Sequence, residues 1–398
     1  MLQGRHVVLG VSGGIACYKA CVLARRFVEA GARVDTIMTA AAAEFIRPVT
    51  FEALTGRPVL TSLWDGGGAL SHVRLGQEAD LVVVAPATAH LLARLAQGLA
   101  DDVLTATLLA SRAPLLLAPA MNDAMYAAEA TQANLAILHG RGAHLVGPGV
   151  GALAEGPSDQ PGRMSEPEEI VAEAVRLLAR GGVLAGQRVV VTAGPTREPI
   201  DPVRVVTNPS SGRMGYAIAA AAWRRGAEVT LVTGPTPLPI PYGVSAVRVV
   251  TTDQLAAALH GLLPETDVLV MAAAPADYAP TEPSAAKRPR LDGLLSVQLA
   301  PTPDVLLTTA ARRKAGSTLV GFALETGDAV AKGRQKLERK GMDLCIVNDA
   351  TESGAGFEVE TNRVTILGRD GTAHALPLLP KSVVAEHILD AIEVRRGG

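Results

Sequence analysis

The sequence predicts an α/β protein built from two Rossmann-like domains with mainly parallel sheets. Short apolar strands alternate with helices along most of the chain, and this alternation is typical of parallel sheets joined by right-handed crossovers. The pattern starts twice, at Arg5–Ile15 and again at Gln187–Asp201, each time with a strand that runs into a glycine-containing turn. Hydrophobic residues make up 48% of the chain but aromatic residues only 3%, so the core is expected to consist mainly of Ala, Val and Leu.

Length, charge and cysteine content limit the class of protein. A chain of 398 residues is long enough for two domains that each bury a substantial core. The net charge of −2 gives no general reason to expect a nucleic-acid or membrane partner, and no apolar run reaches the roughly 18 residues of a membrane-spanning helix. A strand beginning at His6 leaves no room for a signal peptide. Cys17, Cys21 and Cys345 match neither a disulfide framework nor a metal site, so a cytoplasmic protein is expected.

The first half of the chain follows the alternation in regular order. We predict strands at His6–Val11, Arg33–Met38, Leu81–Ala85 and Leu115–Ala118. We predict helices at Ile15–Ala30, His90–Ala96, Thr131–Gly140 and Glu168–Ala179. The last of these follows Pro167 and has acidic residues in its first turn, as the helix dipole favours. Glycines at 181, 182 and 186 then break the pattern, so we place one domain at residues 1–182 and a second at 186–398.

The second half alternates in the same way and ends differently. Strands are predicted at Arg188–Thr192, Glu228–Val232, Val268–Met271, Leu319–Ala323 and Leu344–Val347. Helices are predicted at Arg213–Arg225, Asp253–Leu263 and Ala329–Lys340. Arg363–Leu367 and Thr372–Leu376 flank an Asp-Gly pair and predict a terminal β-hairpin. Pro275–Gly293 lacks periodicity and is expected to be a long working loop.

Small and polar residues follow the strands of the first half. Ser12 and Gly13 form part of a turn before a helix, where a phosphate or a plain tight turn would fit equally. The run Ala85, Pro86, Ala87 and Thr88 ends a strand at the carboxyl edge of the sheet, where open α/β folds bind ligands. Asn122 ends the next strand and suits either a carboxylate ligand or a helix cap. His72 lies in a predicted loop, and an isolated histidine of this kind is more often a satisfied surface residue than a catalytic one.

Taken in order, these motifs resemble the flavin-containing cysteine decarboxylases, and most of all phosphopantothenoylcysteine decarboxylase. The resemblance covers nearly all of residues 1–180 and is carried by Gly10–Lys19, Ser71–Val73, Ala85–Thr88, Ala100–Asp102 and Pro119–Asn122. It implies a flavodoxin-like flavoprotein domain with an FMN site formed by the Ser12–Gly13 turn, Thr39 and the Ala85–Thr88 turn. It also implies that His72 is catalytic and that Asn122 holds the substrate carboxylate. Such enzymes oxidise the cysteinyl thiol with flavin, because the resulting thioaldehyde can accept the electrons left when CO₂ departs.

One segment of the first half departs from this family. The family has a cysteine in a flap, and that cysteine assists the last reduction step. Here the corresponding stretch is Leu153–Met164, in which Glu155 stands at the position of the cysteine and the flap is one residue longer. We expect the last proton to arrive by another route, through Glu155, Ser158 or Asp159. The alternative is an active ligase whose amino-terminal domain binds FMN without decarboxylating.

The second half carries a different set of polar residues. Three prolines stiffen Thr192–Arg204, and Ser210, Ser211 and Gly212 precede a helix, where they offer hydroxyl and N–H groups to an anion or simply cap the helix. Asp277 follows a strand at the carboxyl edge, where it is suited to hold a metal, and Lys287 lies in the basic loop after it. Lys332, Lys336 and Lys340 share one helix face, so a phosphate ligand, Glu338 or solvent must relieve their repulsion.

These motifs resemble phosphopantothenate–cysteine ligase across essentially all of residues 186–398. Their carriers are Thr192–Arg204, Asn208–Gly215, Ala272–Tyr278, Gly321–Thr326 and the Lys336/Lys340 pair. The resemblance implies CTP and Mg²⁺, an acyl-cytidylate of 4′-phosphopantothenate, and its capture by the amine of L-cysteine. It implies that Asn208 contacts the acyl-cytidylate and that Ser210, Ser211 and Gly212 form the turn before the helix. It also implies that Asp277 and Lys287 contact the nucleotide and its metal. Phe322 would then lie near the cytidine, and Lys336 and Lys340 would contact the triphosphate.

Both halves together resemble the bifunctional decarboxylase/ligases of coenzyme A synthesis. That resemblance implies homo-oligomers, with trimeric contacts in the first domain, FMN at subunit contacts and dimeric contacts in the second, which combine into a dodecamer. Pro209 and Pro275 depart from the ligase pattern and put the geometry of the loop, more than its role, in question. A nicotinamide oxidoreductase is a further alternative. It ranks low because neither start has a G-x-G-x-x-G turn, although Asp35 lies at a suitable distance from the first.

Overall fold

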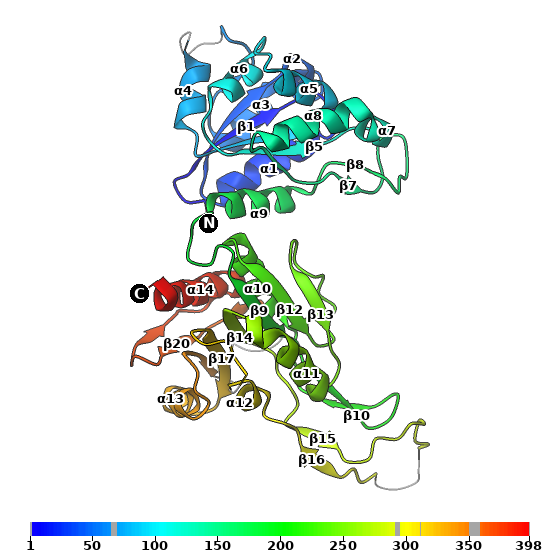
Figure 1. Cartoon of the computed structure of the whole chain (residues 1–398), viewed down its shortest axis with the longest axis vertical. Coiled ribbons are helices and arrows are strands. Elements are labelled where there is room, and N and C mark those ends of the chain that lie inside the picture. The colour runs from blue at the N-terminus through cyan, green and yellow to red at the C-terminus, as the bar shows by residue number, and fades with distance from the viewer. Residues whose placement is uncertain (1, 65–69, 291–294, 311, 350–358, 398) are drawn as a thin grey trace. The chain divides into compact units, whose positions relative to one another are not determined.

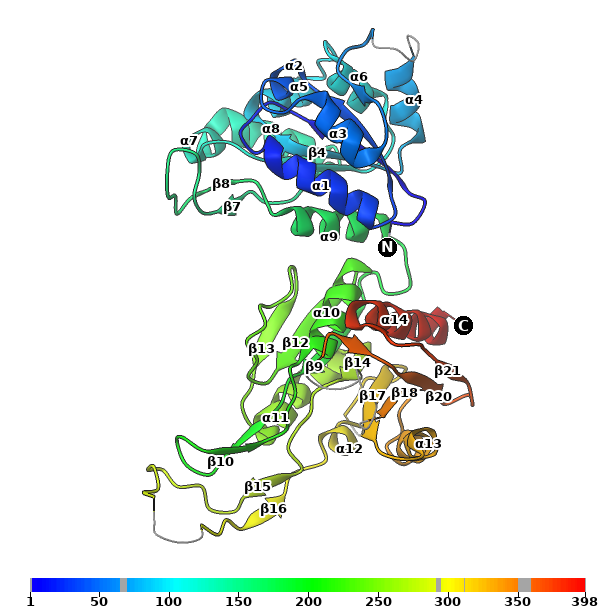
Figure 2. The same ribbon diagram turned by 180° about the vertical axis from the view of Figure 1, so that it is seen from behind.

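The structure is a computed structural model that describes residues 2–64, 70–290, 295–310, 312–349 and 359–397. It divides into two compact units, Met1–Leu178 and Ala179–Gly398 (Figures 1 and 2). Both units alternate strands with helices, as the sequence predicts. In the part of the chain that the structure describes, no helix is long and apolar enough to span a bilayer.

The first unit is built on one parallel sheet of six strands. The strand order is β3-β2-β1-β4-β5-β6, the doubly wound order of Rossmann-like domains, so the predicted fold class is confirmed. The order reverses between β1 and β4, and open α/β sheets bind ligands beside such a reversal. The strands are β1 (His6–Val11), β2 (Arg33–Met38), β3 (Val59–Leu60), β4 (Leu81–Ala87), β5 (Leu115–Pro119) and β6 (His144–Leu145).

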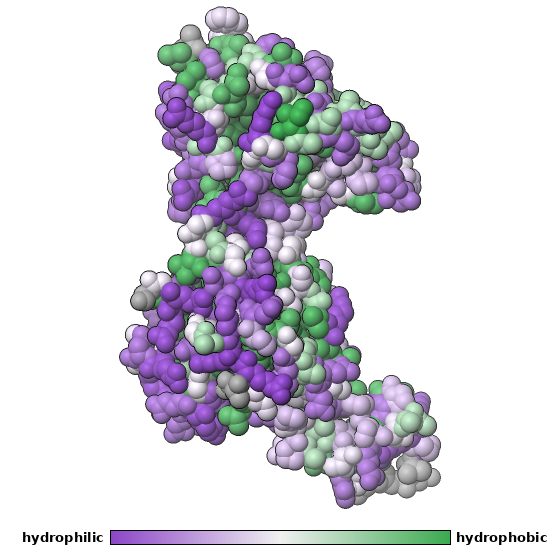
Figure 3. Space-filling view, viewed as in Figure 1, coloured by the Kyte–Doolittle hydropathy of each residue, from purple (hydrophilic) through white to green (hydrophobic). Residues whose placement is uncertain are grey.

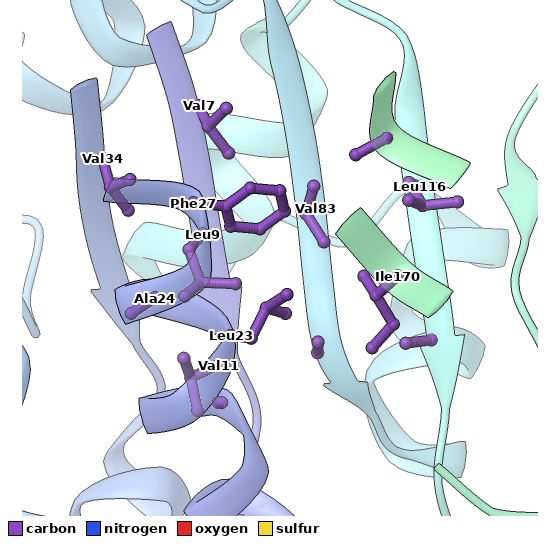
Figure 4. Packing of buried hydrophobic residues seen from close by; sticks show 14 of the residues in the cluster. Val7, Leu9, Val11, Leu23, Ala24, Phe27, Val34, Val83, Leu116 and Ile170 are labelled. Atoms are coloured by element: carbon purple, nitrogen blue, oxygen red, sulfur yellow. The ribbon is translucent and has the colours of Figure 1, made fainter. Parts of the chain in front are cut away.

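Helices cover both faces of this sheet. One face packs against α1 (Cys17–Glu29), α3 (Pro48–Thr55) and α9 (Pro167–Leu178), and Figure 4 shows Leu23 and Phe27 of α1 directed at Val7, Leu9 and Val83. The other face packs against four helices. They are α4 (Ser71–Glu78), α5 (Ala89–Gln97), α6 (Val103–Ala110) and α8 (Glu129–Gly140). The sheet is therefore buried on both sides, which explains its nearly continuous Val and Leu runs.

The second unit is built on a sheet of eight strands in the order β13-β12-β9-β14-β17-β18-β20-β21. The strands from β13 to β18 are parallel, whereas β20 and β21 form the predicted antiparallel hairpin at the edge. The strands are β9 (Arg188–Ala193), β12 (Glu228–Thr233), β13 (Ser245–Arg248), β14 (Val268–Met271), β17 (Thr318–Glu325), β18 (Leu344–Asp349), β20 (Thr365–Gly368) and β21 (Ala373–Ala375).

The helices of the second unit also lie on both faces of the sheet. One core cluster joins the sheet to α11 (Thr252–Leu262), α12 (Val305–Ala310) and α13 (Ala329–Arg339). On the opposite face α10 (Arg213–Arg224) lies directly on β9, and α14 (Lys381–Gly397) packs beside α10 (Figures 1 and 2). Hydrophilic side chains dominate the surface around α13 and α14 in Figure 3. The apolar stripes of these helices therefore face the sheet.

Several short elements, such as α3, α6, α12 and β13, were not predicted, and three further segments differ from the sequence-based expectation. His72 was expected in a loop but lies on α4, because Leu75 and Gly76 in the same turns are buried against neighbouring helices. The expected loop Pro275–Gly293 contains β15 (Tyr278–Pro280), which pairs with β16 (Leu299–Pro301), while residues 291–293 are outside the described residues. The helix α14 was not predicted, although Val384, Ile388 and Ile392 are buried with helical spacing.

The remaining elements are short. The stiff turn after β9 forms a hairpin of β10 (Arg197–Pro199) and β11 (Val205–Thr207), and β15 lies beside it. The others are α2 (Ala40–Ala43), α7 (Asp123–Ala127), β7 (Gly149–Val150), β8 (Pro161–Arg163), a 3₁₀ turn (Leu263–Glu265), β19 (Thr361–Asn362) and β22 (Leu379–Pro380).

A charge cluster joins α14 to α10. The Arg225 guanidinium lies 2.8 Å from Glu386, 2.9 Å from Glu393 and 2.7 Å from Asp390, and Arg224 lies 2.8 Å from the second oxygen of Glu386. Burial alone would raise the pKa of Glu386, but the hydrogen bonds from both arginines outweigh it and hold that pKa below its ordinary value of 4.5. The cluster therefore fixes the last helix of the chain by charge as well as by apolar packing.

We expect Arg225→Ala to lower the free energy of unfolding of the second unit by about 2 kcal/mol or more, because it leaves Glu393 and Asp390 without their arginine and Glu386 with Arg224 alone. Urea unfolding of the full-length protein measures this. Arg188→Gln is the matched control, since Arg188 is exposed and its pairs with Glu228 and Glu265 are expected to contribute less than about 1 kcal/mol. Equal losses in the two variants would contradict the assignment.

The same cluster predicts a dependence on acid. A carboxyl whose pKa is lower in the folded than in the unfolded protein stabilises the fold above the unfolded pKa, and this stabilisation is lost as the pH falls through the folded value. For Glu386 the loss is expected below about pH 4.5. Unfolding curves at pH 7 and pH 3.5 should therefore differ more for the unmodified protein than for Glu386→Gln.

Candidate functional site

A cavity of about 820 Å³ lies at the carboxyl edge of the first sheet. Its walls come from the turns that follow β1, β2, β4 and β5, together with the β7–β8 hairpin. Residues far apart in the sequence therefore meet there. Six of the predicted site residues line it, namely Ser12, Gly13, Thr39, Thr88, Asn122 and Glu155.

Helix N-termini converge on this cavity. Thr39, Thr88 and Asn122 are the N-caps of α2, α5 and α7, and their side-chain oxygens accept hydrogen bonds from Ala42 (3.2 Å), Leu91 (3.4 Å) and Ala124 (2.9 Å) respectively. Uncapped N–H groups and the positive end of the helix dipole favour an anion at such a position. The cavity thus suits a ligand that carries a phosphate or a carboxylate.

The end of β4 positions two of these residues. The Ser12 hydroxyl donates to the carbonyl oxygen of Pro86 at 2.7 Å and accepts from the Thr88 N–H at 3.1 Å. Ala85, Pro86 and Ala87 are buried in β4 and do not reach the cavity wall, whereas Thr88 does. The Pro86 carbonyl oxygen thus holds the Ser12 hydroxyl, which in turn holds the backbone N–H of Thr88.

Gly13 permits a close approach between the first turn and α2. A Cβ atom at position 13 would lie 2.4 Å from the Cβ of Ala41 and 2.6 Å from its carbonyl carbon. Neither distance is possible without moving α2. A Cβ at Gly14 would lie 3.5 Å from Thr88, which is an ordinary contact. Only the first of the two glycines is required by packing.

The side-chain oxygen of Asn122 caps a helix, whereas its side-chain NH₂ group is available to a ligand. Its Oδ1 accepts from the backbone N–H groups of Ala124 at 2.9 Å and Met125 at 3.4 Å, so the helix-cap interpretation is confirmed. Both partners are donors, which identifies the acceptor atom as oxygen. The Nδ2 group remains as a hydrogen-bond donor at the cavity, so the cap does not exclude a role in binding a carboxylate.

The flap brings Glu155 to the cavity. Leu153 and Gly156 exchange backbone hydrogen bonds of 2.8 and 3.2 Å, and the exposed Glu155 lies in the turn between them. Ser158 instead donates to Asp123 at 2.6 Å, which holds the pKa of Asp123 below its ordinary value. Of the three replacements considered for the missing cysteine, only Glu155 lines the cavity.

His72 does not line the cavity of its own chain among the residues that the structure describes. It is half-buried on α4, whose far end is held near β1 because Nδ1 of His6 lies 3.1 Å from the carbonyl oxygen of Glu78. The histidine that does line the cavity is His90, in the first turn of α5. Sequence reasoning missed His90, although its place two residues after the N-cap Thr88 was a usable signal.

Cysteine is present near the cavity only beneath its surface. The Cys17 thiol is buried in α1 and donates to the carbonyl oxygen of Ser12 at 3.2 Å. Burial raises the pKa of Cys17 and of the half-buried Cys21, and it raises the pKa of Cys345 in the second unit to about 12. A thiol that stays protonated is a poor nucleophile and a poor acid.

The second unit also gathers its motifs at the carboxyl edge of its sheet. Asn208 donates through Nδ2 to the carbonyl oxygens of Pro275 (2.9 Å) and Ala274 (3.4 Å), and the Ala274 N–H donates to Gly194 (2.9 Å). Residues from three separate motifs therefore meet beside the N-terminus of α10, which is preceded by the predicted residues Ser210, Ser211 and Gly212. This arrangement leaves Oδ1 of Asn208 as its remaining acceptor.

Asp277 and Lys287 are both exposed. Their loop is tied to the turn after β9, because the Arg288 N–H donates to Asp201 at 3.3 Å and Arg204 donates to the Arg288 carbonyl oxygen at 3.0 Å. Within the described ranges no group of three or more His, Cys, Asp or Glu side chains is arranged to hold a metal. A cation at Asp277 would need further oxygen ligands from a bound molecule.

The lysine row on α13 is partnered within the chain. Lys336 pairs with Glu325, Lys340 lies 2.9 Å from Asp304, and Lys332 donates to the Thr326 carbonyl oxygen at 2.6 Å. Their mutual repulsion is therefore relieved without a ligand. A cavity of about 590 Å³ borders Lys332 and Lys336. Phe322 is half-buried on β17 and, by strand alternation, points to the face opposite Glu325.

Comparison with known proteins matches each unit to a protein family. A family model described as "Flavoprotein" matches residues 1–179, and one described as "DNA/pantothenate metabolism flavoprotein C-terminal domain" matches residues 184–395. The chain is 48% identical to the "Coenzyme A biosynthesis bifunctional protein CoaBC" of Mycobacterium bovis, with 98% of this chain and 96% of that protein covered. Proteins of the same name from Vibrio cholerae (98% of each chain covered) and Bacillus subtilis (98% and 97% covered) are each 43% identical.

We expect Gly13→Ala to destabilise the first unit by about 1–3 kcal/mol, because the added methyl group forces α2 and its cap Thr39 away from the cavity. We also expect the purified variant to contain less flavin per chain. Urea unfolding and the ratio of flavin to protein absorbance measure the two effects. Gly14→Ala is the matched control, and the interpretation is wrong if both variants lose flavin and stability equally.

Proposed function

Because this chain belongs to the family of coenzyme A biosynthesis bifunctional proteins, we propose that its second unit joins 4′-phosphopantothenate to L-cysteine with CTP and that its first unit decarboxylates the product with FMN. The observation that carries the proposal is the match over both halves of the chain, combined with a cavity in the first unit that presents three helix N-termini and the Nδ2 group of Asn122. The two reactions are consecutive, since the amide made by one is the substrate of the other.

The first cavity fits FMN by its donor set. The turn at Ser12 and Gly13 and the caps Thr39 and Thr88 offer hydroxyl and N–H groups to a phosphate, and the missing Cβ at Gly13 keeps this cradle tight. FMN, when bound, supplies oxidation of the substrate thiol and the later return of the hydride. Asn122 would hold the substrate carboxylate through Nδ2. This contact would fix the orientation of the carbon–carbon bond that breaks when CO₂ leaves.

Glu155 is our candidate for the proton that completes the decarboxylation. It lines the cavity where the family has a cysteine, and it lies on a turn whose backbone is closed by two hydrogen bonds. A protonated carboxylic acid can donate its proton to a carbon atom of the enethiol. Bulk water can then reprotonate the exposed carboxylate. The buried Cys17 cannot take this role, because its thiol already donates to the Ser12 carbonyl oxygen.

We assign His72 to the cavity of a neighbouring copy. It is absent from the lining of its own chain, whereas side chains such as Ile15 and Tyr18, both exposed here, border that cavity and offer apolar contacts for another chain. A homo-oligomer with FMN at subunit contacts would bring His72 to Asn122.

The ligase site follows from the charges at the carboxyl edge of the second sheet. The carboxylate of 4′-phosphopantothenate attacks the α-phosphorus of CTP and pyrophosphate leaves; the amine of cysteine then attacks the acyl carbon and CMP leaves. Lys336 and Lys340 would exchange Glu325 and Asp304 for the triphosphate. Asp277 would hold Mg²⁺ together with triphosphate oxygens, as is usual for this ion, and Asn208 and Lys287 would border the acyl-cytidylate, with Phe322 at the cytidine.

A single assay tests both halves. The protein receives 4′-phosphopantothenate, L-cysteine labelled with ¹⁴C in the carboxyl group, Mg²⁺ and either CTP or ATP, and CMP, AMP and ¹⁴CO₂ are followed together. Formation of CMP and ¹⁴CO₂ supports the proposal. CMP without ¹⁴CO₂ in protein that contains FMN would establish the alternative, a ligase with a non-decarboxylating flavoprotein domain. Absence of both nucleotide products would overturn the ligase assignment.

We expect Glu155→Ala to slow the decarboxylase by about 100-fold or more while FMN content stays unchanged, since general acid catalysis typically contributes 10²–10⁴-fold. The variant should accumulate the oxidised, decarboxylated enethiol, which is detected by mass spectrometry. Asp159→Ala, on the same flap, is the control and should retain activity. If the Asp159 variant is the slower of the two, the proton donor has been misassigned.

The placement of His72 predicts complementation between subunits. His72→Asn and Asn122→Asp should each be inactive as decarboxylases, and Asp should preserve the α7 cap. When the two variants are co-expressed and assemble randomly, roughly a quarter of the sites combine an intact Asn122 with an intact His72 from a neighbour. Recovery of activity to that extent supports the shared site. No recovery, with mixed oligomers shown to form, would place His72 outside the reaction.

A further inference from the structure

A third cavity lies in the second unit, away from the lysine row. It measures about 500 Å³ and opens at the carboxyl ends of β12 and β13. Its walls are the loop Thr233–Pro237, the segment Arg248–Val250 and the side chain of Arg197. Among the described residues that line this cavity, which we call the arginine cavity, Arg197 and Arg248 carry the only charges.

Neither guanidinium has a carboxylate partner within the described part of the chain. No described Asp or Glu oxygen comes within ion-pair distance of Arg197 or Arg248, although acidic residues outnumber Lys and Arg in the sequence, 39 to 37. Elsewhere in this unit arginines find carboxylates readily, as Arg225 does three times. Two unpaired cations at one cavity repel each other, and an oxyanion between them would turn that repulsion into attraction.

The opposite wall of the arginine cavity is rigid. Thr236 donates through Oγ1 to the Tyr216 hydroxyl at 3.0 Å, the Tyr216 hydroxyl lies 3.2 Å from Oγ1 of Thr233, and that atom donates to the Gly234 carbonyl oxygen at 2.9 Å. Pro235 and Pro237 restrict the backbone of the same loop. A wall that is ordered before a ligand arrives reduces the entropy lost on binding.

Hydrogen bonds connect this wall to the ligase site. The Gly234 N–H donates to the carbonyl oxygen of Ala193, and the next carbonyl, that of Gly194, accepts from Ala274; both bonds are 2.9 Å long. The carbonyl oxygen of Ala274 in turn accepts from Asn208 at 3.4 Å. The arginine cavity is therefore a near neighbour of Asn208, on the side of the sheet order opposite β17 and α13. A nucleotide bound at the lysine row would therefore leave the arginine cavity unoccupied.

We propose that the arginine cavity is an oxyanion subsite that holds the acidic group of a small-molecule substrate of the ligase reaction. This rests on the function proposed above. Besides the nucleotide, that reaction has two substrates, and each carries one acidic group that takes no part in bond making or breaking. These groups are the phosphate of 4′-phosphopantothenate and the carboxylate of L-cysteine. Arginine binds either group through two parallel hydrogen bonds.

The test compares each substrate with an analogue that lacks the acidic group. Ligase kcat/KM is measured for 4′-phosphopantothenate against pantothenate, and for L-cysteine against cysteamine, in the full-length protein and in Arg248→Gln and Arg197→Gln. We expect each variant to lower kcat/KM by on the order of tenfold to a hundredfold for one substrate and to leave its analogue unchanged. The substrate that loses its advantage identifies the acidic group. Arg369→Gln, an exposed arginine on the terminal hairpin, should change neither ratio.

Several results would overturn the proposal. If both variants lower kcat/KM equally for a substrate and for its analogue, the arginines act on structure or on the reaction itself. If all four values stay unchanged, the cavity is not a subsite. Arg248→Lys separates the two cases further, since it keeps the charge and should recover part of the lost preference. A full-length protein that forms no CMP contradicts the proposed function, whereas an active protein whose variants keep their preferences contradicts this inference alone.

Discussion

The binding edge of each unit depends on the close approach of the first turns of its helices to the neighbouring backbone. In a parallel sheet all strands end at one edge, and the helices that follow start there, so the positive ends of their dipoles meet at that edge. The approach requires small side chains. A Cβ at Gly13 would overlap Ala41, and one at Gly215 would lie 2.6 Å from the Cβ of Ala193. The abundance of Gly and Ala in this sequence is thus a condition for placing polar backbone groups at the binding edge.

Under the function proposed above, the same geometry would serve two kinds of binding. The first unit relies on neutral donors, such as the capped ends at Thr39 and Thr88, whose charge is spread over a helix. The second unit relies on full charges that are already paired, since Lys336 and Lys340 are held by Glu325 and Asp304. Although burial opposes it, the hydrogen bond from Lys340 holds the pKa of Asp304 below its ordinary value. A cofactor that stays bound suits the first arrangement, and a co-substrate that is consumed suits the second.

The sequence was most informative where a pattern is local. Alternating strands and helices, the parallel sheets and the edge hairpin follow from periodicity and from an Asp-Gly turn, and all are confirmed. The helix α14 escaped prediction because its stability comes from contacts with α10 that lie more than 150 residues away in sequence. His72 appeared in a loop for a related reason, since burial of α4 against its neighbours decides its structure. The arginine cavity joins β10, β12 and β13, and no spacing along the chain indicates that Arg197 and Arg248 line the same cavity.

The buried cysteines have a consequence for a protein whose proposed substrate and product both carry free thiols. Mixed disulfides form when a protein thiolate meets a small-molecule disulfide, so they require an exposed and ionised cysteine. Cys17 and Cys345 are buried, Cys21 is half-buried, and the pKa of each is raised. Glu155 stands where related flaps have a cysteine, and no cysteine of the described residues lines the cavity of the first unit. Oxidised substrate can therefore accumulate during redox stress without becoming covalently attached to the protein.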